Sequence, residues 1–226
     1  MKQGTINLFH IPITDLIHQI DNEFECVYDY QKHVIFLKNQ SGDTIGQIRL
    51  PLHLTLNDQL EILNENTQTL YLSIESGNAA ICTMKGKTNT YHTTFSAYMT
   101  RKKQGVSQIK YLNKKGKSRA GSRVRLAKTI EFFENINSTL GDLLKEETYS
   151  RIGINCNATL IPFLYNSKVQ CPWDKKDQRL YKIPLHIPQS NFTHLDKAIK
   201  KLMAPLLIYD NRFKDELKIF DSLNNC

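Results

Sequence analysis

The spacing of apolar and polar residues changes several times in the first part of the chain, and each change predicts a different element. Apolar positions at helical spacing around Leu16 predict a helix within residues 1–24. Residues 27–38 are rich in β-branched and aromatic side chains and predict a strand. A turn at 41–43 returns the chain into a second strand, so we expect a hairpin. Residues 57–63 predict a short helix.

The remaining sequence continues this alternation of strands and helices. Residues 69–88 predict two strands or one long bulged strand, and residues 91–100 alternate as a further strand does. Apolar residues then recur at helical spacing and predict a long helix after Ser122: Val124, Ala127, Ile130, Phe133 and Ile136. A buried strand, a strand interrupted by a proline, and a helix follow, at residues 158–165, 179–188 and 190–203. The interleaving predicts an α/β protein with a mixed β-sheet and packed helices.

One segment carries most of the positive charge. Residues 76–130 hold 13 of the 30 Lys and Arg residues and no Asp or Glu, whereas the rest of the 226-residue chain is mildly acidic. Charge concentrated in this way is typical of a site for a polyanion. The densest part, from Arg101 to Arg125, has no helical or strand period over most of its length and predicts a long loop.

The composition of this basic loop suits phosphate. Its glycines allow close approach of the backbone, and its serines and the N-terminus of the helix that follows can donate hydrogen bonds to phosphate oxygens. Gln108 lies within the loop. A neutral glutamine is not a strong base, but its amide can orient a water molecule and stabilise charge.

Other kinds of site find little support. The five cysteines are widely separated and the seven histidines form no pair at metal-ligand spacing, so we expect neither a metal nor a cofactor. Ser107 and Ser122 have no histidine nearby, which disfavours a hydrolytic triad. A two-metal nuclease needs clustered carboxylates, and the helix acids Asp142, Glu146 and Glu147 are expected to be solvated. With no membrane-length apolar run and no secretory signal, we expect a cytoplasmic protein without a membrane partner.

Two blocks of the basic loop carry a resemblance to a known family. The run AYMTRKKQGVSQ and then NKKGKSRAGSRVR, followed by a long helix, resemble the catalytic segment of the Vms-like release factors, the family of the eukaryotic quality-control factors known as Vms and ANKZF. The later segment LYKIPLHIPQSNFTHLDKAIKKL is similar to a strand and helix of that family. The resemblance covers roughly residues 24–210 and is strongest in the loop.

The resemblance implies both a fold and an activity. The family's catalytic domain is similar to the middle domain of eukaryotic and archaeal class I release factors, which has an RNase H-like α/β fold. It implies an N-terminal extension at 1–23, a catalytic domain at 24–210 with its basic loop at 101–121, and a tail at 211–226. It further implies a hydrolase that binds stalled large ribosomal subunits and frees the nascent peptide from peptidyl-tRNA. We expect the protein to be a monomer.

Carried over by matching positions, the resemblance makes Gln108 the catalytic residue, and Gly105, Val106 and Ser107 the residues that shape the loop tip. The expected RNA contacts are the basic residues of the two blocks: Arg101, Lys102, Lys103, Lys114, Lys115, Lys117, Arg119, Arg123 and Arg125.

Val106 is a departure from the family, because glycine is more common at this position. A β-branched residue resists a positive φ angle, so Val106 would slow or abolish an activity that needs one there. Val106 therefore keeps open the alternative of a ribosome- or RNA-binding module without turnover. The resemblance leaves a second alternative, because cleavage at the tRNA 3′ end is also known among the family and its relatives: a nuclease that acts on the 3′ CCA end of the tRNA.

Overall fold

The computed structural model describes residues 3–98 and 120–220, without the side chains of 120–123 and 125, and the chain divides into two compact units. Unit 1 comprises residues 1–67, 85–88 and 199–226, and unit 2 comprises residues 68–84 and 89–198. These units are defined by compactness, and the expected division into an extension at 1–23, a catalytic domain at 24–210 and a tail at 211–226 stays a prediction. Strand β1 (Gln3–Asn7) pairs along its whole length with β12 (Leu206–Asp210), so both ends of the chain contribute to unit 1.

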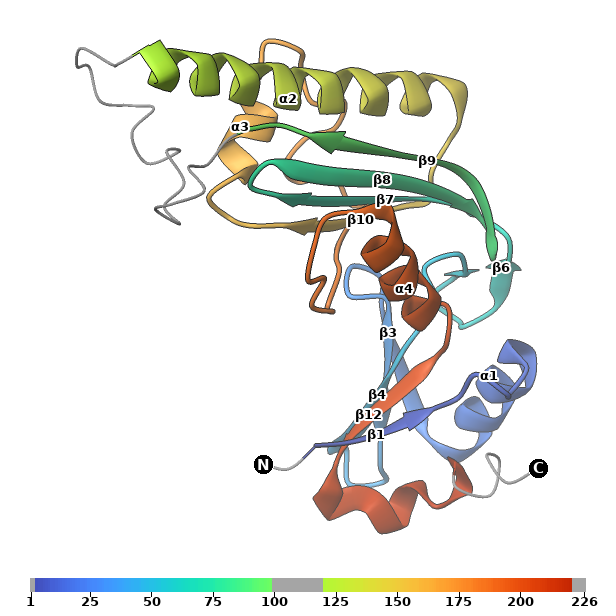
Figure 1. The fold of residues 1–226 in the computed structure, drawn as a ribbon. Helices are drawn as coiled ribbons and strands as arrows, with labels where there is room; N and C mark the ends of the chain where they lie inside the picture. Colours follow the sequence, from blue (N-terminus) through green and yellow to red (C-terminus); the bar gives the residue numbers. More distant parts are fainter. Residues whose placement is uncertain (1–2, 99–119, 221–226) are drawn as a thin grey trace. The chain divides into compact units, whose positions relative to one another are not determined.

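Unit 1 is built on an antiparallel sheet with the strand order β1-β12-β4-β3-β2 (Figure 1). Helix α1 (Ile13–Glu23) buries Leu16, Ile17 and Ile20 in the same core as the apolar side chains of this sheet. The other elements of the unit are β2 (Glu25–Asp29), β3 (Val34–Lys38), β4 (Thr44–Arg49), the small pair β5 (Thr55–Leu56) and β6 (Ile62–Asn64), and the 3₁₀ helix η2 (Asn211–Leu217).

Unit 2 is built on a mixed sheet with the order β11-β10-β7-β8-β9. Strands β7 (Gln68–Glu75), β8 (Asn78–Lys85) and β9 (Thr88–Ser96) follow one another through two-residue turns, which makes them antiparallel. Strand β10 (Arg151–Cys156) then pairs in parallel with β7, and β11 (Leu180–Lys182) pairs in parallel with β10. Three antiparallel strands continued by two parallel ones match the RNase H-like arrangement, and the expected mixed α/β class is confirmed.

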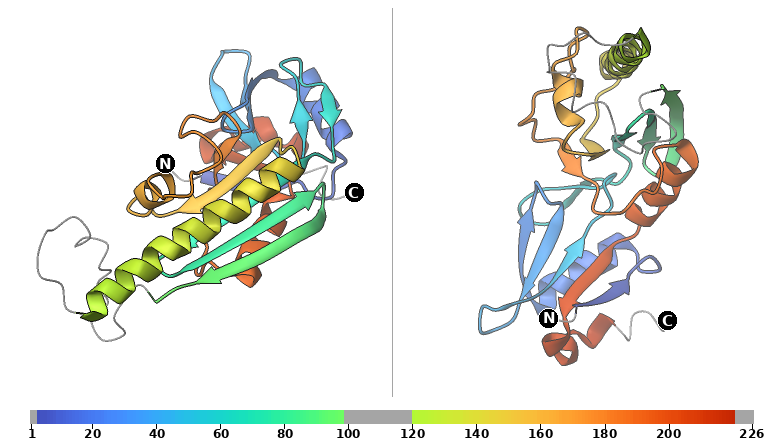
Figure 2. Two further views of the ribbon diagram at one scale, coloured as in Figure 1. Left: turned by 90° about the horizontal axis from the view of Figure 1, so that it is seen from above. Right: turned by 60° about the vertical axis from the view of Figure 1, so that its left-hand side comes forward.

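The long helix α2 (Ala120–Glu146) covers one face of the sheet of unit 2 (Figures 1 and 2). Its apolar side chains Phe132, Phe133, Ile136 and Leu140 are buried in one core with Leu70, Leu72 and Ile74 of β7. Those three residues alternate along the strand and therefore face the helix together. The helix predicted from the spacing of apolar residues is thus confirmed, and it continues through Gly141 to Glu146 without ending there.

Two further helices follow in the sequence. Helix α4 (Phe192–Leu202) confirms the helix predicted at 190–203, and the ring of Phe192 at its start stacks on His92 of β9 at 3.9 Å. The segment expected as a buried strand at 158–165 is instead the short helix α3 (Ile161–Tyr165). The physical reason is Pro162, which fits the first turn of a helix and has no N–H group for a strand ladder.

Two other local predictions were wrong for identifiable reasons. The expected helix at 57–63 is a turn between β5 and β6, in which the Asn57 side chain accepts from the N–H groups of Gln59 and Glu61, and Leu60 has a φ of 62°. The single strand expected at 27–38 is divided by a turn that ends at His33, whose φ is 53°. The imidazole of His33 is held by the Tyr28 hydroxyl and the Pro51 carbonyl, each at 2.8 Å, which stabilises that turn.

Candidate functional site

The structure describes the elements on both sides of the predicted basic loop, β9 and α2. Strand β9 ends at Ser96, and the N–H of Ala97 donates to the Gly77 carbonyl at 2.8 Å, which ties the strand end to the turn between β7 and β8. Helix α2 begins at Ala120, at the same end of the unit toward which β9 runs (Figure 1). Both elements are anchored in the core of unit 2, because Phe95 of β9 packs against the cluster that contains Phe133.

Most residues of the predicted site lie outside the described residues, in the segment 99–119. They are the proposed catalytic residue, the three loop-shaping residues and seven basic residues: Gln108; Gly105, Val106 and Ser107; Arg101, Lys102, Lys103, Lys114, Lys115, Lys117 and Arg119. Arg123 and Arg125 belong to the first turns of α2, and their side chains lie outside the description. Their roles therefore stay predictions.

The beginning of α2 has features that suit an anion. Its first turn contains no acidic residue, so nothing in that turn neutralises the partial positive charge of the helix N-terminus. The nearest acid along the helix is Glu131, which pairs with Lys128 at 2.8 Å. A phosphate at this end would meet free N–H donors and no carboxylate from the same turn.

The first half of α2 also exposes apolar side chains. Val124 is 59% exposed and Ile130 is 41% exposed, in contrast to the buried Phe133 one turn later. Leu126, Ile130 and Phe133 line an apolar pocket of about 400 Å³ together with residues of α3 and of the segment that follows it. The sequence pattern missed this pocket, since it assigned α3 to a strand.

Other chemistries gain no support from the described residues. The described cysteines are free, and burial raises the pKa of Cys26, Cys82 and Cys156 to about 12, so none of these thiols is a nucleophilic thiolate near neutral pH. The described residues contain no group of three His, Cys, Asp or Glu side chains that could hold a metal. Asp142 is exposed and pairs with Lys145, as the prediction of a solvated helix face requires.

Three aromatic residues of unit 2 belong to its core. Phe132 and Phe133 are buried against each other, as the helical spacing of apolar residues predicts. Trp173, whose burial the sequence leaves undecided, is 5% exposed and packs in the same core, because the connector around it folds back onto α3.

No helix among the described residues combines the length and the apolar character that crossing a membrane requires.

Comparison with known proteins identifies the class of protein. A model of a release factor family matches residues 69–208, a range that takes in nearly all of unit 2 and the whole basic loop. Since more than half of the chain is matched, the protein is a release factor in the sense of that family. The chain belongs to the family described as the Bacteroidetes VLRF1 release factor.

Solved structures resemble the chain more distantly. The structure of the "Vms1 mitochondrial localization core" aligns over 83% of this chain and 92% of its own, with 13% sequence identity and a TM-score of 0.47. Pelota from Archaeoglobus fulgidus aligns over 99% of this chain and 69% of its own, with 11% identity and a TM-score of 0.30. A search of the curated proteins gave no match.

Proposed function

We propose that the protein releases the nascent peptide from peptidyl-tRNA on stalled large ribosomal subunits, and that Gln108 positions the attacking water. The observation that carries this proposal is the position of Gln108 and the basic loop inside the range matched by a release factor family. The loop connects β9 to α2, and these two elements pack in one core. Fixed attachment points at both ends suit a loop that must place a catalytic side chain accurately.

In the proposed mechanism the loop accelerates the reaction by holding the tRNA ester and the attacking water in position. Basic residues on both sides of Gln108 bind the backbone of transfer or ribosomal RNA, and the amide of Gln108 holds a water against the ester that joins the peptide to the tRNA ribose. Hydrolysis breaks the bond between the ester carbonyl carbon and the ribose oxygen. The water supplies the hydroxyl of the new peptide carboxyl group, and a proton ends on the ribose. Holding the two reactants in this way is the main source of the rate gain, because glutamine is no strong base.

We further propose where and in which process the protein acts. A cytoplasmic, monomeric hydrolase of this kind would act in ribosome-associated quality control. The domain that carries the activity would lie within 24–210, and its centre would be unit 2.

The test is release from purified large subunits that carry a labelled peptidyl-tRNA, with the 3′ end of the tRNA resolved on a sequencing gel. Release with an intact CCA end supports ester hydrolysis. Release with a shortened tRNA would make the protein a nuclease of the tRNA end instead. Binding to the subunit without any release would favour a binding module, the alternative that Val106 suggests.

A further inference from the structure

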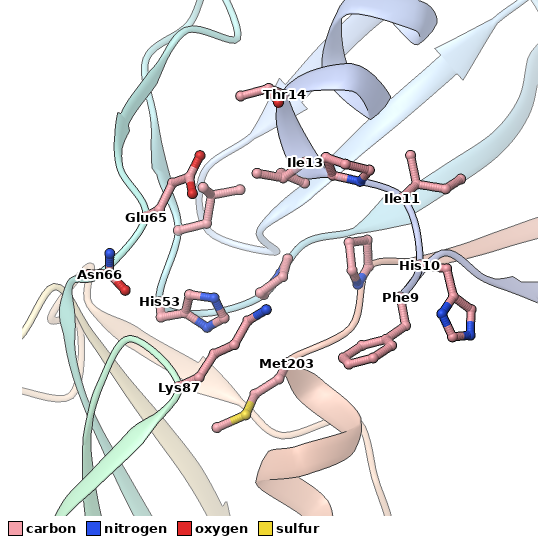
Figure 3. A pocket seen from close by; sticks show the side chains of 14 residues that line it. Phe9, His10, Ile11, Ile13, Thr14, His53, Glu65, Asn66, Lys87 and Met203 are labelled. Carbon is pink, nitrogen blue, oxygen red and sulfur yellow. The ribbon is translucent and has the colours of Figure 1, made fainter. Parts of the chain in front are cut away.

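Unit 1 contains a cavity of about 510 Å³ that the proposed reaction does not use (Figure 3). All of its lining residues belong to unit 1. They come from the segment 9–14 before and within α1, the segment 51–54 after β4, Glu65 and Asn66, Lys87, and the region around Met203. The cavity combines a cation, a helix N-terminus, a buried imidazole and an exposed aromatic ring.

The cation is Lys87, and the local backbone fixes its position. Gly86 has a φ of 57°, in the left-handed region that favours glycine, and its N–H donates to the Thr67 carbonyl at 3.1 Å. A Cβ atom at Gly86 would collide with the Asn66 side chain. Lys87 therefore leaves a tightly held turn, and Figure 3 shows its ammonium group directed into the cavity.

The N-terminus of α1 lies on the same cavity. Ile13 and Thr14 line it, and the residue before the helix, Pro12, provides no side-chain cap. The first N–H groups of a helix have no acceptor within the helix, so this end presents donors and a partial positive charge, part of which Asp15 in the first turn offsets.

His53 supplies a second and independent sign of a ligand. Its side chain is 6% exposed and lines the cavity beside Lys87 (Figure 3). Its backbone carbonyl is held by the N–H and the hydroxyl of Thr67, at 3.1 and 2.9 Å, which fixes the direction of the side chain. In the described part of the chain no hydrogen bond of the imidazole ring is observed, and its nitrogens are not among the buried polar atoms that lack a partner, so they open onto the cavity. Ring nitrogens in this position are available to a ligand or to water.

The aromatic ring is that of Phe9, which is 56% exposed at the edge of the cavity. Lys87 Nζ lies 5.7 Å from its centroid, and the His10 ring meets it edge-on at 5.5 Å. An exposed ring next to a cation is a platform on which a nucleic-acid base can stack while its phosphate meets the charge.

We propose that this cavity binds one nucleotide of single-stranded RNA. Lys87, the N-terminus of α1 and the His53 ring hold the phosphate, and the base stacks on Phe9. Glu65, the one carboxylate among the lining residues, accepts a hydrogen bond from the ribose 2′-hydroxyl. The inference rests on the proposed function for the source of the RNA, and it adds a second RNA contact, in unit 1, to that of the basic loop.

The test uses the full-length chain with Gln108→Ala, so that no turnover disturbs it. Adenosine 5′-monophosphate is titrated and followed by NMR, with adenosine and inorganic phosphate as separate ligands and short oligoadenylates of RNA and DNA as competitors. We expect the signals of Phe9, Thr14 and His53 to shift with a Kd on the order of 1 mM, and the RNA oligomer to compete better than the DNA oligomer.

Three single substitutions make the test specific. Lys87→Gln and Phe9→Ala change exposed side chains, and each should weaken binding by about fivefold or more. Lys85→Gln is the matched control, because Lys85 is an exposed lysine two residues away that does not line the cavity. It should leave the affinity within about twofold.

Two results would overturn the inference. One is the absence of shifts at these three residues up to about 10 mM nucleotide. The other is an equal loss of affinity in Lys85→Gln and Lys87→Gln, which would reveal unspecific charge attraction. Neither result bears on peptide release, and a failure of the release assay would leave the shifts in unit 1 unchanged, so the two proposals fail separately.

Discussion

At the scale of single residues, the sequence predicts a chemistry for the loop but not the features that depend on neighbours distant in sequence. Gln108 is proposed from its motif. Lys87 entered only as one charge among 13, because its place beside His53 and Phe9 depends on contacts that bring residues 9, 53 and 87 together. The left-handed conformations of His33 and Leu60 likewise have no signal in the residue types, and they ended or replaced elements that propensity predicted.

Val106→Gly tests the residue that departs from the family. If the valine restricts the loop, the glycine variant should release peptide faster than wild type under the same single-turnover conditions, because glycine reaches positive φ at no steric cost. Binding to the subunit should change little. An unchanged or lower release rate would mean that the loop works without a positive φ at this position.

The buried His53 gives a pH dependence with a definite sign. Burial first, and then the charge of Lys87, lowers the pKa of His53 from an unperturbed value near 6.5 to about 4. The neutral ring is favoured in the folded state, so its contribution to stability is complete above pH 6.5 and is lost as the pH falls toward 4. We expect unit 1 to lose about 2 kcal/mol of unfolding free energy between about pH 7.5 and about pH 5 from this group.

Urea unfolding followed through NMR signals of unit 1 measures this effect. Asp29 also titrates in acid, because the backbone N–H of Lys32 lowers the pKa of its carboxyl group, so a control is needed. His53→Gln removes only the imidazole titration and should flatten the profile between pH 6.5 and about 4. An identical profile in wild type and His53→Gln would contradict the assignment.

At the scale of elements, patterns with a long repeat were predicted well and short apolar runs were not. The 27 residues of α2 show sustained helical spacing, and both α2 and α4 were found. Strand β10, with the sequence RIGINC, has no continuous apolar run and was missed. The segment of α3 was assigned to a strand, because a run of about five apolar residues fits either element and only tertiary packing decides between them. For α3 the sequence did contain one signal of a helix, because Pro162 fits the first turn of a helix and not the interior of a sheet.

The framework of the loop predicts a coupling between the core and activity. Phe133 of α2 is buried among core residues and stacks on Phe163 of α3 at 5.8 Å. Phe133→Ala should cost about 3–5 kcal/mol of stability, measured by denaturant unfolding, and should lower release even though the loop sequence is intact. Val124→Ala, which changes an exposed position of the same helix, is the matched control and should leave stability within about 0.5 kcal/mol. Full release by the Phe133 variant in its folded state would contradict a positioning role for α2.

At the scale of the whole molecule, the charge distribution was the most informative property of the sequence, and the division into units was the least visible. The formal charge of +8 arises from one segment of an otherwise acidic chain. The two units could not be predicted, because unit 1 is assembled from both ends of the chain and from a turn in the middle. Pairing of β1 with β12 joins the two ends of the sequence, and no local pattern carries such information.

Charge reversal tests the proposed anchoring to RNA at this scale. Replacement of Lys114, Lys115 and Lys117 by glutamate should weaken binding to the large subunit. It should also flatten the salt dependence, by about 0.7–0.9 in the log–log slope for each phosphate that is no longer neutralised. Sedimentation with purified subunits over a range of salt concentrations measures both quantities. Retained affinity with an unchanged slope would rule out these lysines as RNA ligands.

We propose that Gln108 acts in the chemical step of peptide release. The measurement that tests it most directly is the single-turnover release rate of wild type and Gln108→Ala on saturating subunits that carry peptidyl-tRNA, with subunit binding measured in parallel. We expect equal binding and a loss of release on the order of 100-fold or more, the size expected when a group that stabilises the transition state is removed. Release at the wild-type rate by Gln108→Ala would contradict it.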